Sequence, residues 1–579
     1  MLAAVASAGG PQAAEKCVLA LAGAARGAAS GVEVLVAGSD GLLAMADGGL
    51  DPTTRMAWVG HPRPGGSGAA GCPLTLRGDF AAAALSGQDE LLLARSRFGG
   101  RSLYWTTDPR SGALLACSRL SPIVAGLDGV SVNETRLAAS LIRATLSDQT
   151  QTHYRGIHRV PSACVLRVGP EGVRARYDTP FDVRPVRVAP IDDLADELRE
   201  LIFATVTRSL EGVDHAGVLV SGGLDSATLL AAVVAVAKRS GKRVDAFNLN
   251  FAARGDDRAH LNALCEMLGV TPVRVSPRDC GAVLPETFVI DRSPTGWSQA
   301  SWDIALTRRS RDCGAAVLLS GLGGDEVFGG DMRMFVDRAR QGHPWSSLHA
   351  AARLQGWSGT PMSRMRSLVL RRLISGVAPR PLRGAVAALR RRDPVPWAGP
   401  QLRRFVSGGA FEVGIAGNLR GRSTDRSWLE WLARSGVYLQ ISEARAQVEM
   451  AAGCARVDPF LDDDLVEFAA SLRPDLLFHG GWSRGLLRYA MRGLLPESLR
   501  LRQDKSYFEP ALQQVVEGAG GFSTLGSLAS ATALADLGLV EPRRFRDRFD
   551  ELSRDPLNGP LWIEVWSVLA GEAFVRQAS

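Results

Sequence analysis

The spacing of apolar residues changes near residue 180. Before it, short alternating runs such as Leu91–Ala94 and Leu114–Ala116 are divided by Gly and Pro turns, a pattern typical of β-strands. After it, longer apolar groups follow helical spacing, beginning with an amphipathic helix from Asp192. The three prolines of Pro180–Pro190 predict a linker. We therefore expect a β-rich domain at residues 1–182 and an α/β domain at residues 190–579.

The second part of the chain contains buried strands that alternate with helices. Apolar runs at Gly217–Val220, Ala246–Asn250, Val273–Val275 and Ala316–Leu319 predict strands, and the segments between them have helical patterns. This order predicts a parallel sheet, in which ligands lie at the carboxyl ends of the strands. A helical, arginine-rich insert is expected at about residues 331–421.

The first strand runs into a small, flexible loop followed by a helical segment from Ala227. Backbone amides and the positive end of the helix dipole converge at such a point, which favours an anion such as phosphate. Glycines let the backbone approach closely, and serines add hydroxyl donors. Asp225 suits such a site only if a divalent metal bridges it to phosphate. The loop consists of Ser221, Gly222, Gly223, Leu224, Asp225 and Ser226, and no Gly-Lys-Ser/Thr of a Walker loop closes it.

A second glycine-rich turn follows the strand at Ala316–Leu319. It begins with Ser320 and Gly321 and carries the acid pair Asp325-Glu326. Alone, such a pair is an ordinary feature of a helix N-terminus. With the first loop in the same chain, Asp325 is expected to complete a Mg²⁺ site with Asp225.

Composition narrows the class of protein. The chain has 579 residues, enough for two or three domains, and a net charge of +7 that is carried almost wholly by arginine. Between Arg364 and Arg404 there are eleven arginines against one acid, Asp393. Either a solvated helical face or a docking surface for an acidic partner explains this cluster, and its few aromatic residues argue against nucleic acid. The sequence has no apolar run that would span a membrane and no CxxC pair, so we expect a cytoplasmic protein without a membrane anchor, zinc ribbon or disulfide framework.

Four motifs resemble the class B asparagine synthetase family, which includes β-lactam synthetases and lasso peptide cyclases. They are the loop at 221–226, the turn at 320–326, Pro459–Asp462, and Lys505 in Gln503–Phe508. The resemblance implies an ATP pyrophosphatase fold that splits ATP into AMP and pyrophosphate, with Mg²⁺ on Asp225 and Asp325. It also implies that Lys505 stabilises the charge that develops as pyrophosphate leaves. The nucleotide site that it implies comprises Leu219, Ser221, Gly222, Gly223, Leu224, Asp225, Ser226, Leu249, Ser320, Gly321 and Lys505.

The first domain resembles the glutaminase domain of the same family. The similarity lies in Gly78–Phe80, Leu91–Tyr104 and Tyr154–Pro161, and it implies an Ntn-hydrolase-like αββα sandwich. Those relatives attack glutamine with an N-terminal cysteine. Here Leu2 follows Met1, and no Asn-Gly-Glu segment occurs near Ala46–Asp51. We therefore expect a scaffold that does not hydrolyse glutamine, and a nucleophile other than ammonia.

The acceptor half of the site departs from the family. Leu322 stands where relatives carry Glu or Tyr, and Ala455 where many carry Glu, so the base for the amine is unassigned. Nearby candidates are Glu449, Asp458, His479 and Tyr507.

The combined pattern is most similar to a lasso peptide cyclase. Such an enzyme adenylates an Asp or Glu side chain of a core peptide and joins it to the peptide's N-terminal amine, with a leader peptidase and a leader-binding protein as partners. The alternatives are a β-lactam synthetase, an ammonia-dependent asparagine synthetase and a non-catalytic binding scaffold.

Overall fold

The structure is a computed structural model. It describes residues 2–6, 33–36, 42–45, 49–51, 56–64, 76–86, 90–146, 148–179, 186–252, 257–330, 332, 334–355, 360–370, 395–408, 411–412, 425–434, 436–503 and 507–578. Lys505 and most of the arginine cluster lie outside these residues. The predictions made for them are not addressed by the fold.

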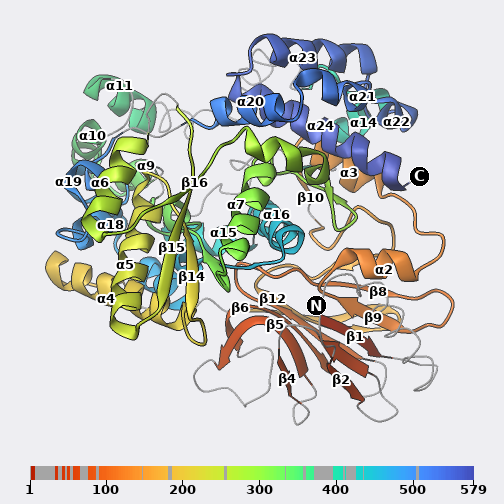
Figure 1. The fold of residues 1–579 in the computed structure, drawn as a ribbon, viewed down its shortest axis with the longest axis horizontal. Coiled ribbons are helices and arrows are strands. Elements are labelled where there is room, and N and C mark those ends of the chain that lie inside the picture. The colour runs from red at the N-terminus through yellow and green to blue at the C-terminus, as the bar shows by residue number, and fades with distance from the viewer. Residues whose placement is uncertain are drawn as a thin grey trace.

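Two six-stranded antiparallel sheets form the N-terminal part (Figure 1). One has the order β11-β8-β9-β1-β3-β2, with β1 Leu2–Ala6, β2 Glu33–Val36, β3 Leu42–Met45, β8 Tyr104–Thr107, β9 Leu114–Cys117 and β11 His158–Arg159. The other has the order β13-β12-β7-β6-β5-β4, with β4 Gly49–Asp51, β5 Met56–Pro64, β6 Leu76–Leu85, β7 Leu91–Arg95, β12 Cys164–Gly169 and β13 Gly172–Asp178.

Buried apolar side chains of both sheets form one shared core, which contains Ala81 and Leu93 of one sheet and Trp105 and Leu114 of the other. The predicted β-rich N-terminal part is confirmed as a pair of packed sheets. Helices α2 (Leu120–Gly126) and α3 (Glu134–Leu141) follow β9. The αββα layering of an Ntn hydrolase stays a prediction.

A five-stranded parallel sheet with the order β16-β15-β14-β19-β21 is the centre of the C-terminal part. Its strands are β14 His215–Leu219, β15 Arg243–Leu249, β16 Val273–Val275, β19 Val317–Leu319 and β21 Ala455–Val457. The four strands expected from the sequence are confirmed, as is their parallel arrangement. Strand β21 was not predicted, because three residues between two helices carry too little pattern.

Helices pack against this sheet. Helix α5 (Leu224–Ser240) begins directly after the loop and is buried along most of its length, and Gly241 ends it in the left-handed region, at φ 68°. The helices nearest to the sheet in the chain are α4 Ile191–Ser209, α6 Arg258–Leu268, the 3₁₀ helix η3 Asp279–Thr287 and α7 Ala300–Asp312, with the hairpin β17 Val289–Ile290 and β18 Ser293–Pro294.

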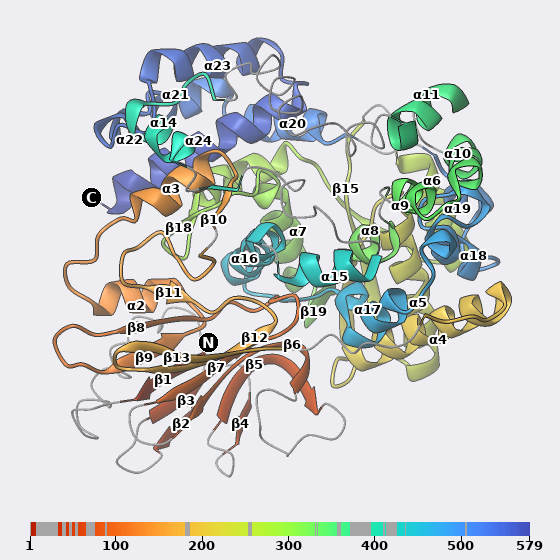
Figure 2. The same ribbon diagram turned by 180° about the vertical axis from the view of Figure 1, so that it is seen from behind.

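The rest of the chain is mainly helical (Figure 2). Helix α8 (Gly324–Phe328) comes just before the expected insert. The described elements of the insert are α9 Met334–Arg340, α10 Pro344–Ala352, α11 Pro361–Met365, the π-helical η4 Arg366–Leu370, α14 Pro400–Ser407 and β20 Phe411–Glu412, which pairs with β10 Thr145–Leu146. After it come α15 Asp425–Arg434, α16 Gly436–Ala452, η5 Pro459–Leu461, α17 Asp463–Ala470, η6 Pro474–Gly481, α18 Gly485–Ala490, α19 Glu497–Arg500, α20 Glu509–Gly518, η7 Phe522–Leu525, α21 Gly526–Ala529, α22 Thr532–Asp536, α23 Pro542–Arg554 and α24 Gly559–Ala578. Among the described helices none combines the length and apolar character needed to cross a bilayer.

Charged side chains join the N-terminal sheets to the second part of the chain. Glu467 of α17 is 1% exposed and contacts Arg77 at 2.9 Å and Arg97 at 3.1 Å. Just before it, Asp464 contacts Arg63 at 2.9 Å. Phe98 adds an apolar contact, with its ring edge-on to Tyr438 at 5.5 Å. These contacts fix the sheets beside α17, which follows β21 and η5 in the chain.

Candidate functional site

The loop at 221–226 is held in shape by its own two serines. The Ser226 hydroxyl accepts a hydrogen bond from the Ser221 amide at 3.0 Å and lies 2.9 Å from the Ser221 hydroxyl. The Ser221 hydroxyl in turn accepts a bond from the Gly223 amide at 3.2 Å. No side chain caps α5 at Gly223, so the first amides of this helix point into the space before it. This geometry suits an anion, as expected from the sequence.

The second turn lies so close to this loop that only glycine fits at two positions. A Cβ on Gly321 would lie 2.8 Å from the Ser226 amide nitrogen, and a Cβ on Gly324 would lie 2.5 Å from the Asp225 carboxyl carbon. Gly323 has φ 96°, the left-handed conformation that begins α8. The carboxyl ends of β14 and β19 therefore bring the two motifs together.

Asp225 and Asp325, the expected metal ligands, converge on one cation. Nη1 of Arg484 lies 2.7 Å from Asp225 and 3.0 Å from Asp325. Burial disfavours the guanidinium charge, yet the two carboxylates raise the pKa of Arg484. Burial, together with the charges of Asp325 and Asp225, raises the pKa of the neighbouring Glu326. The sequence did not assign a role to Arg484.

The convergence of these carboxylates fits a divalent cation. Mg²⁺ in nucleotide sites takes one or two protein carboxylates and completes its shell with phosphate oxygens and water. Asp225 is 15% exposed and Asp325 48% exposed, so an ion between them would be open toward phosphates. Among the described residues no group of three His, Cys, Asp or Glu forms a metal cluster. In this part of the chain the protein therefore offers two carboxylates to a metal ion, and not a full set of protein ligands.

A cavity of about 320 Å³ opens beside both motifs. Of the predicted nucleotide residues, those that line it are Leu219, Ser221, Gly223, Asp225, Ser226, Leu249, Ser320 and Gly321. Gly222, Leu224 and Asp325 are adjacent in the chain but do not line it, and Lys505 lies outside the described residues. The volume falls in the range of small-molecule pockets. The structure thus assembles one pocket from residues about a hundred positions apart.

Asp257 supports the loop from the side of α6 and was not singled out by the sequence. It accepts a hydrogen bond from the Gly222 amide at 3.2 Å and contacts Arg502. Arg502 also donates to the Gly222 carbonyl at 2.8 Å. Together they fix the backbone at Gly222, which explains why this residue does not face the cavity.

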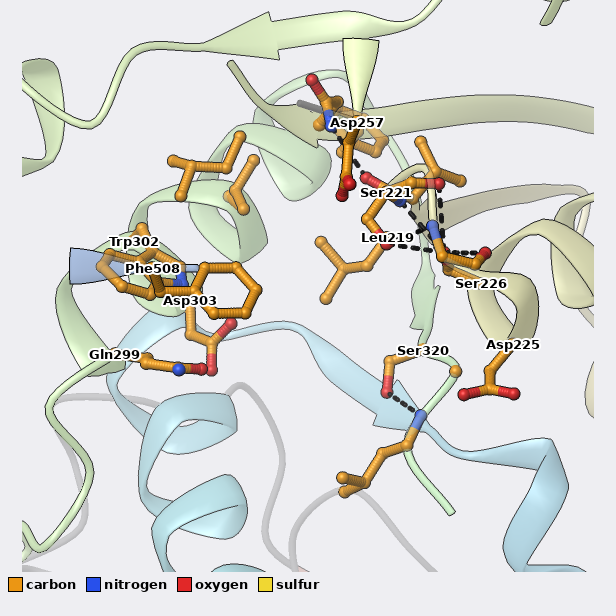
Figure 3. A pocket seen from close by; sticks show the side chains of 18 of the residues that line it. Leu219, Ser221, Asp225, Ser226, Asp257, Gln299, Trp302, Asp303, Ser320 and Phe508 are labelled. Carbon is orange, nitrogen blue, oxygen red and sulfur yellow. Dashed lines mark hydrogen bonds between the residues drawn. The ribbon is translucent and has the colours of Figure 1, made fainter. Parts of the chain in front are cut away.

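The opposite end of the pocket is aromatic and acidic. Figure 3 shows Asp303 and Gln299 next to the rings of Trp302 and Phe508, across the cavity from Ser221, Ser226 and Asp225. The two rings are stacked, with centroids 5.9 Å apart. No sequence pattern predicted this end of the pocket, because α7 and the segment before α20 are about two hundred residues apart.

The four candidate bases lie in different environments. Asp458, next to β21, accepts a hydrogen bond from Ser320 and forms a buried ion pair with Arg445. Glu449 is paired with Arg101 of the N-terminal part. Burial, with Arg492 nearby, lowers the pKa of His479, and Tyr507 is 59% exposed. None of these four lines the pocket.

Five of the six described cysteines are poor nucleophiles. Burial raises the pKa of Cys117 and Cys280 to about 12 and that of Cys164 to about 11, and it also raises the pKa of Cys265 and Cys454. Because the thiolate is the reactive form, these five thiols suit packing better than attack on an amide.

Comparison with known proteins agrees with the geometry of the loops. The profile of the family "Asparagine synthase" matches residues 197–576, and that of a "Glutamine amidotransferase domain" matches residues 66–178. The chain belongs to the asparagine synthase family. That places it in a class of ATP-dependent ligases that form carbon–nitrogen bonds.

The curated relatives are distant. "Asparagine synthetase [glutamine-hydrolyzing] 3" of Bacillus subtilis (strain 168) is 23% identical over 456 residues, which cover 75% of this chain and 68% of the relative. "Asparagine synthetase [glutamine-hydrolyzing] 1" of the same organism is 23% identical over 465 residues, with the same coverage. A solved B. subtilis glutamine phosphoribosylpyrophosphate amidotransferase, complexed with ADP and GMP, has a TM-score of 0.12 and 11% identity. The match covers 42% of this chain and 49% of that structure, and at this TM-score it supports no argument about the fold.

Proposed function

We propose that this member of the asparagine synthase family is an ATP-dependent macrolactam synthetase of the lasso peptide cyclase type. It would adenylate an Asp or Glu side chain of a core peptide and join it to the peptide's N-terminal amine. The observation that supports ATP-dependent activation of a carboxylate is the pocket that the loop at 221–226 shares with the turn at Ser320 and Gly321. The proposal that the substrate is a peptide is based on the resemblance of the sequence to lasso peptide cyclases.

The pocket supports the activation step as follows. The substrate carboxylate attacks the α-phosphorus of ATP, and pyrophosphate departs toward the amides at the start of α5 and the serines of the loop. Asp225 and Asp325 would hold Mg²⁺, which supplies charge neutralisation for the phosphates. Arg484, already between the two carboxylates, keeps both in place. Lys505 is proposed as a second cation for the departing charge.

The choice of an amine other than ammonia rests on two observations. Five of the described cysteines are buried with raised pKa, so they offer no thiolate for release of ammonia from glutamine. Leu322, where relatives carry a proton-transferring residue, lines the pocket with an apolar side chain. Holding both reacting ends of one peptide in a shared pocket favours ring closure over hydrolysis.

The test incubates the full chain with ATP, Mg²⁺ and a synthetic peptide that begins with Gly and has Asp or Glu roughly seven to nine residues on, a spacing that brings the two ends together. We expect a product lighter by one water, together with AMP and pyrophosphate. Production of ADP, or peptide-independent release of AMP alone, would overturn the proposal.

Variants of the activation site sharpen this test. Asp225→Asn and Asp325→Asn should each lower ATP–pyrophosphate exchange by a factor on the order of 100 or more, since each removes charge that positions the phosphates. Lys505→Ala should do the same. Asp475→Asn is the control, because Asp475 is 42% exposed and pairs only with Arg473 among its described contacts, at 3.2 Å. Exchange at the wild-type rate in any of the three site variants would remove that residue from the site.

A further inference from the structure

Asp303 is the acidic group of the pocket with no role in the activation step. It lies in the first turn of α7, 17% exposed, and lines the cavity across from the phosphate-binding loop (Figure 3). Its Oδ2 accepts a hydrogen bond from Nε1 of Trp297 at 2.8 Å and lies 3.8 Å from Nη1 of Arg456. Both of these contacts involve Oδ2 of the carboxylate.

The walls around Asp303 suit a cation. Trp302 is buried, and its ring stacks against the ring of Phe508. The centroid of the Phe508 ring also lies 6.0 Å from that of Phe251. Aromatic faces attract ammonium groups, and a carboxylate beside them supplies the opposite charge. A phosphate would be repelled by Asp303, so this end differs in chemistry from the loop at 221–226.

We propose that this end of the pocket binds the amine substrate, and that Asp303 pairs with its ammonium form and accepts the proton that the attacking nitrogen loses. This rests on the proposed amide-forming reaction and names its missing base. As the nitrogen–carbon bond forms, the carbon–oxygen bond to the phosphate of AMP breaks and its electron pair leaves with AMP. Asp303 first takes one proton from the bound ammonium group and passes it to solvent, which frees the nitrogen lone pair for attack. The second proton, which the nitrogen loses as the amide bond forms, passes to the regenerated Asp303 carboxylate and then to solvent.

Other charged groups around Asp303 set its proton affinity. Arg456 of β21 lies 3.8 Å from it, and Asp458 and the Cys280 thiol of η3 are near enough to interact with it electrostatically. Burial raises the pKa of Asp303 above its ordinary value, although Arg456 and the bond from Trp297 act against this. A carboxylate with a raised pKa is a better proton acceptor than an ordinary aspartate.

The first experiment measures binding of glycinamide to the full chain by calorimetry. Glycinamide carries the amine of an N-terminal residue without a carboxylate, and N-acetylglycinamide is the matched ligand without charge. We expect Asp303→Asn to weaken glycinamide binding about tenfold or more, while N-acetylglycinamide binds neither protein measurably. Asp312→Asn, the same change at the exposed end of the same helix, should leave binding unchanged.

Because Asp303→Asn also changes the ion pair with Arg456, a second variant tests the site without altering any charge. Phe508→Leu removes an aromatic face from a 40% exposed position and should weaken glycinamide binding by roughly two- to fivefold. Binding should also fall at low pH as Asp303 becomes protonated, at a pH above the usual range for aspartate, and at high pH as the amine loses its charge. Thermal unfolding of each variant identifies any that fails to fold.

Three results would overturn the inference: equal binding of glycinamide to wild type and folded Asp303→Asn, no binding to wild type, or displacement of glycinamide by AMP, which would assign the aromatic end to the nucleotide. The peptide assay tests the proposed function separately. There Asp303→Asn should slow amide formation more than ATP–pyrophosphate exchange, and hydroxylamine, which needs less help from a base, should restore part of the trapping of the acyl-adenylate. If wild type shows no exchange with any such peptide, the proposed function fails while the binding result stands.

Discussion

At the scale of single residues, Arg484 explains how two acids remain side by side. Its guanidinium is 9% exposed and contacts Asp225 and Asp325 at 2.7 and 3.0 Å. Removing one partner of this partly buried ionic cluster should lower the free energy of unfolding by less than the roughly 3–5 kcal/mol of a fully buried pair, because Asp325 is 48% exposed and solvent screens its charge. The same removal leaves the two carboxylates available to a metal.

We therefore expect Arg484→Gln to unfold at a lower temperature than wild type without metal, and to recover part of the difference in millimolar-range Mg²⁺. Calorimetry with and without Mg²⁺ checks this without a substrate. Arg473→Gln serves as the control, since Arg473 is 51% exposed and its pair with Asp475 should contribute at most about 1 kcal/mol. If Mg²⁺ does not change the unfolding temperature of Arg484→Gln, that result would argue against a metal site at Asp225 and Asp325.

At the scale of elements, the close approach of two loops limits what fits at Gly321. Its Cβ would lie 2.8 Å from the Ser226 amide nitrogen and 3.1 Å from the Asp225 carbonyl carbon. Gly321→Ala should therefore push the turn away from the loop and lower ATP–pyrophosphate exchange by a factor on the order of 10 to 100, as small misplacements in active sites do. Gly296→Ala, with open space around its Cβ, should exchange at the wild-type rate. Equal rates in the two variants would mean that the loops need not touch.

The sequence predicted these elements well where one strand carries one motif. Apolar runs that end in Gly-rich turns located β14 and β19, and the parallel order followed from the helices between strands. The residues that contact these motifs could not be predicted from the sequence. Arg484 is 259 positions from Asp225, and its role follows only from packing. Asp303 lies in a helix whose pattern gives no sign that its first turn faces a pocket.

At the scale of the whole molecule, α17 joins the N-terminal sheets to the rest. Glu467 is almost fully buried between Arg77 and Arg97, both of which come from the β6–β7 region. A neutral amide at this position leaves two guanidinium groups with less compensation in a dry interface. Glu467→Gln should accordingly lower the free energy of unfolding by about 3–5 kcal/mol, against at most about 1 kcal/mol for Glu497→Gln, whose side chain is 62% exposed.

The form of the unfolding curve tells what holds the two parts together. If the ionic contacts of α17 dominate, the sheets of Glu467→Gln should unfold in a separate, earlier calorimetric transition, because their own shared core stays intact. If the contact of Phe98 with Tyr438 dominates, one transition persists and the two glutamine variants lose similar stability. We expect the first outcome, since Arg77 and Arg97 of the sheets meet the buried carboxylates of Glu467 and Asp463 on α17, and apolar contact by one ring replaces little of that interaction.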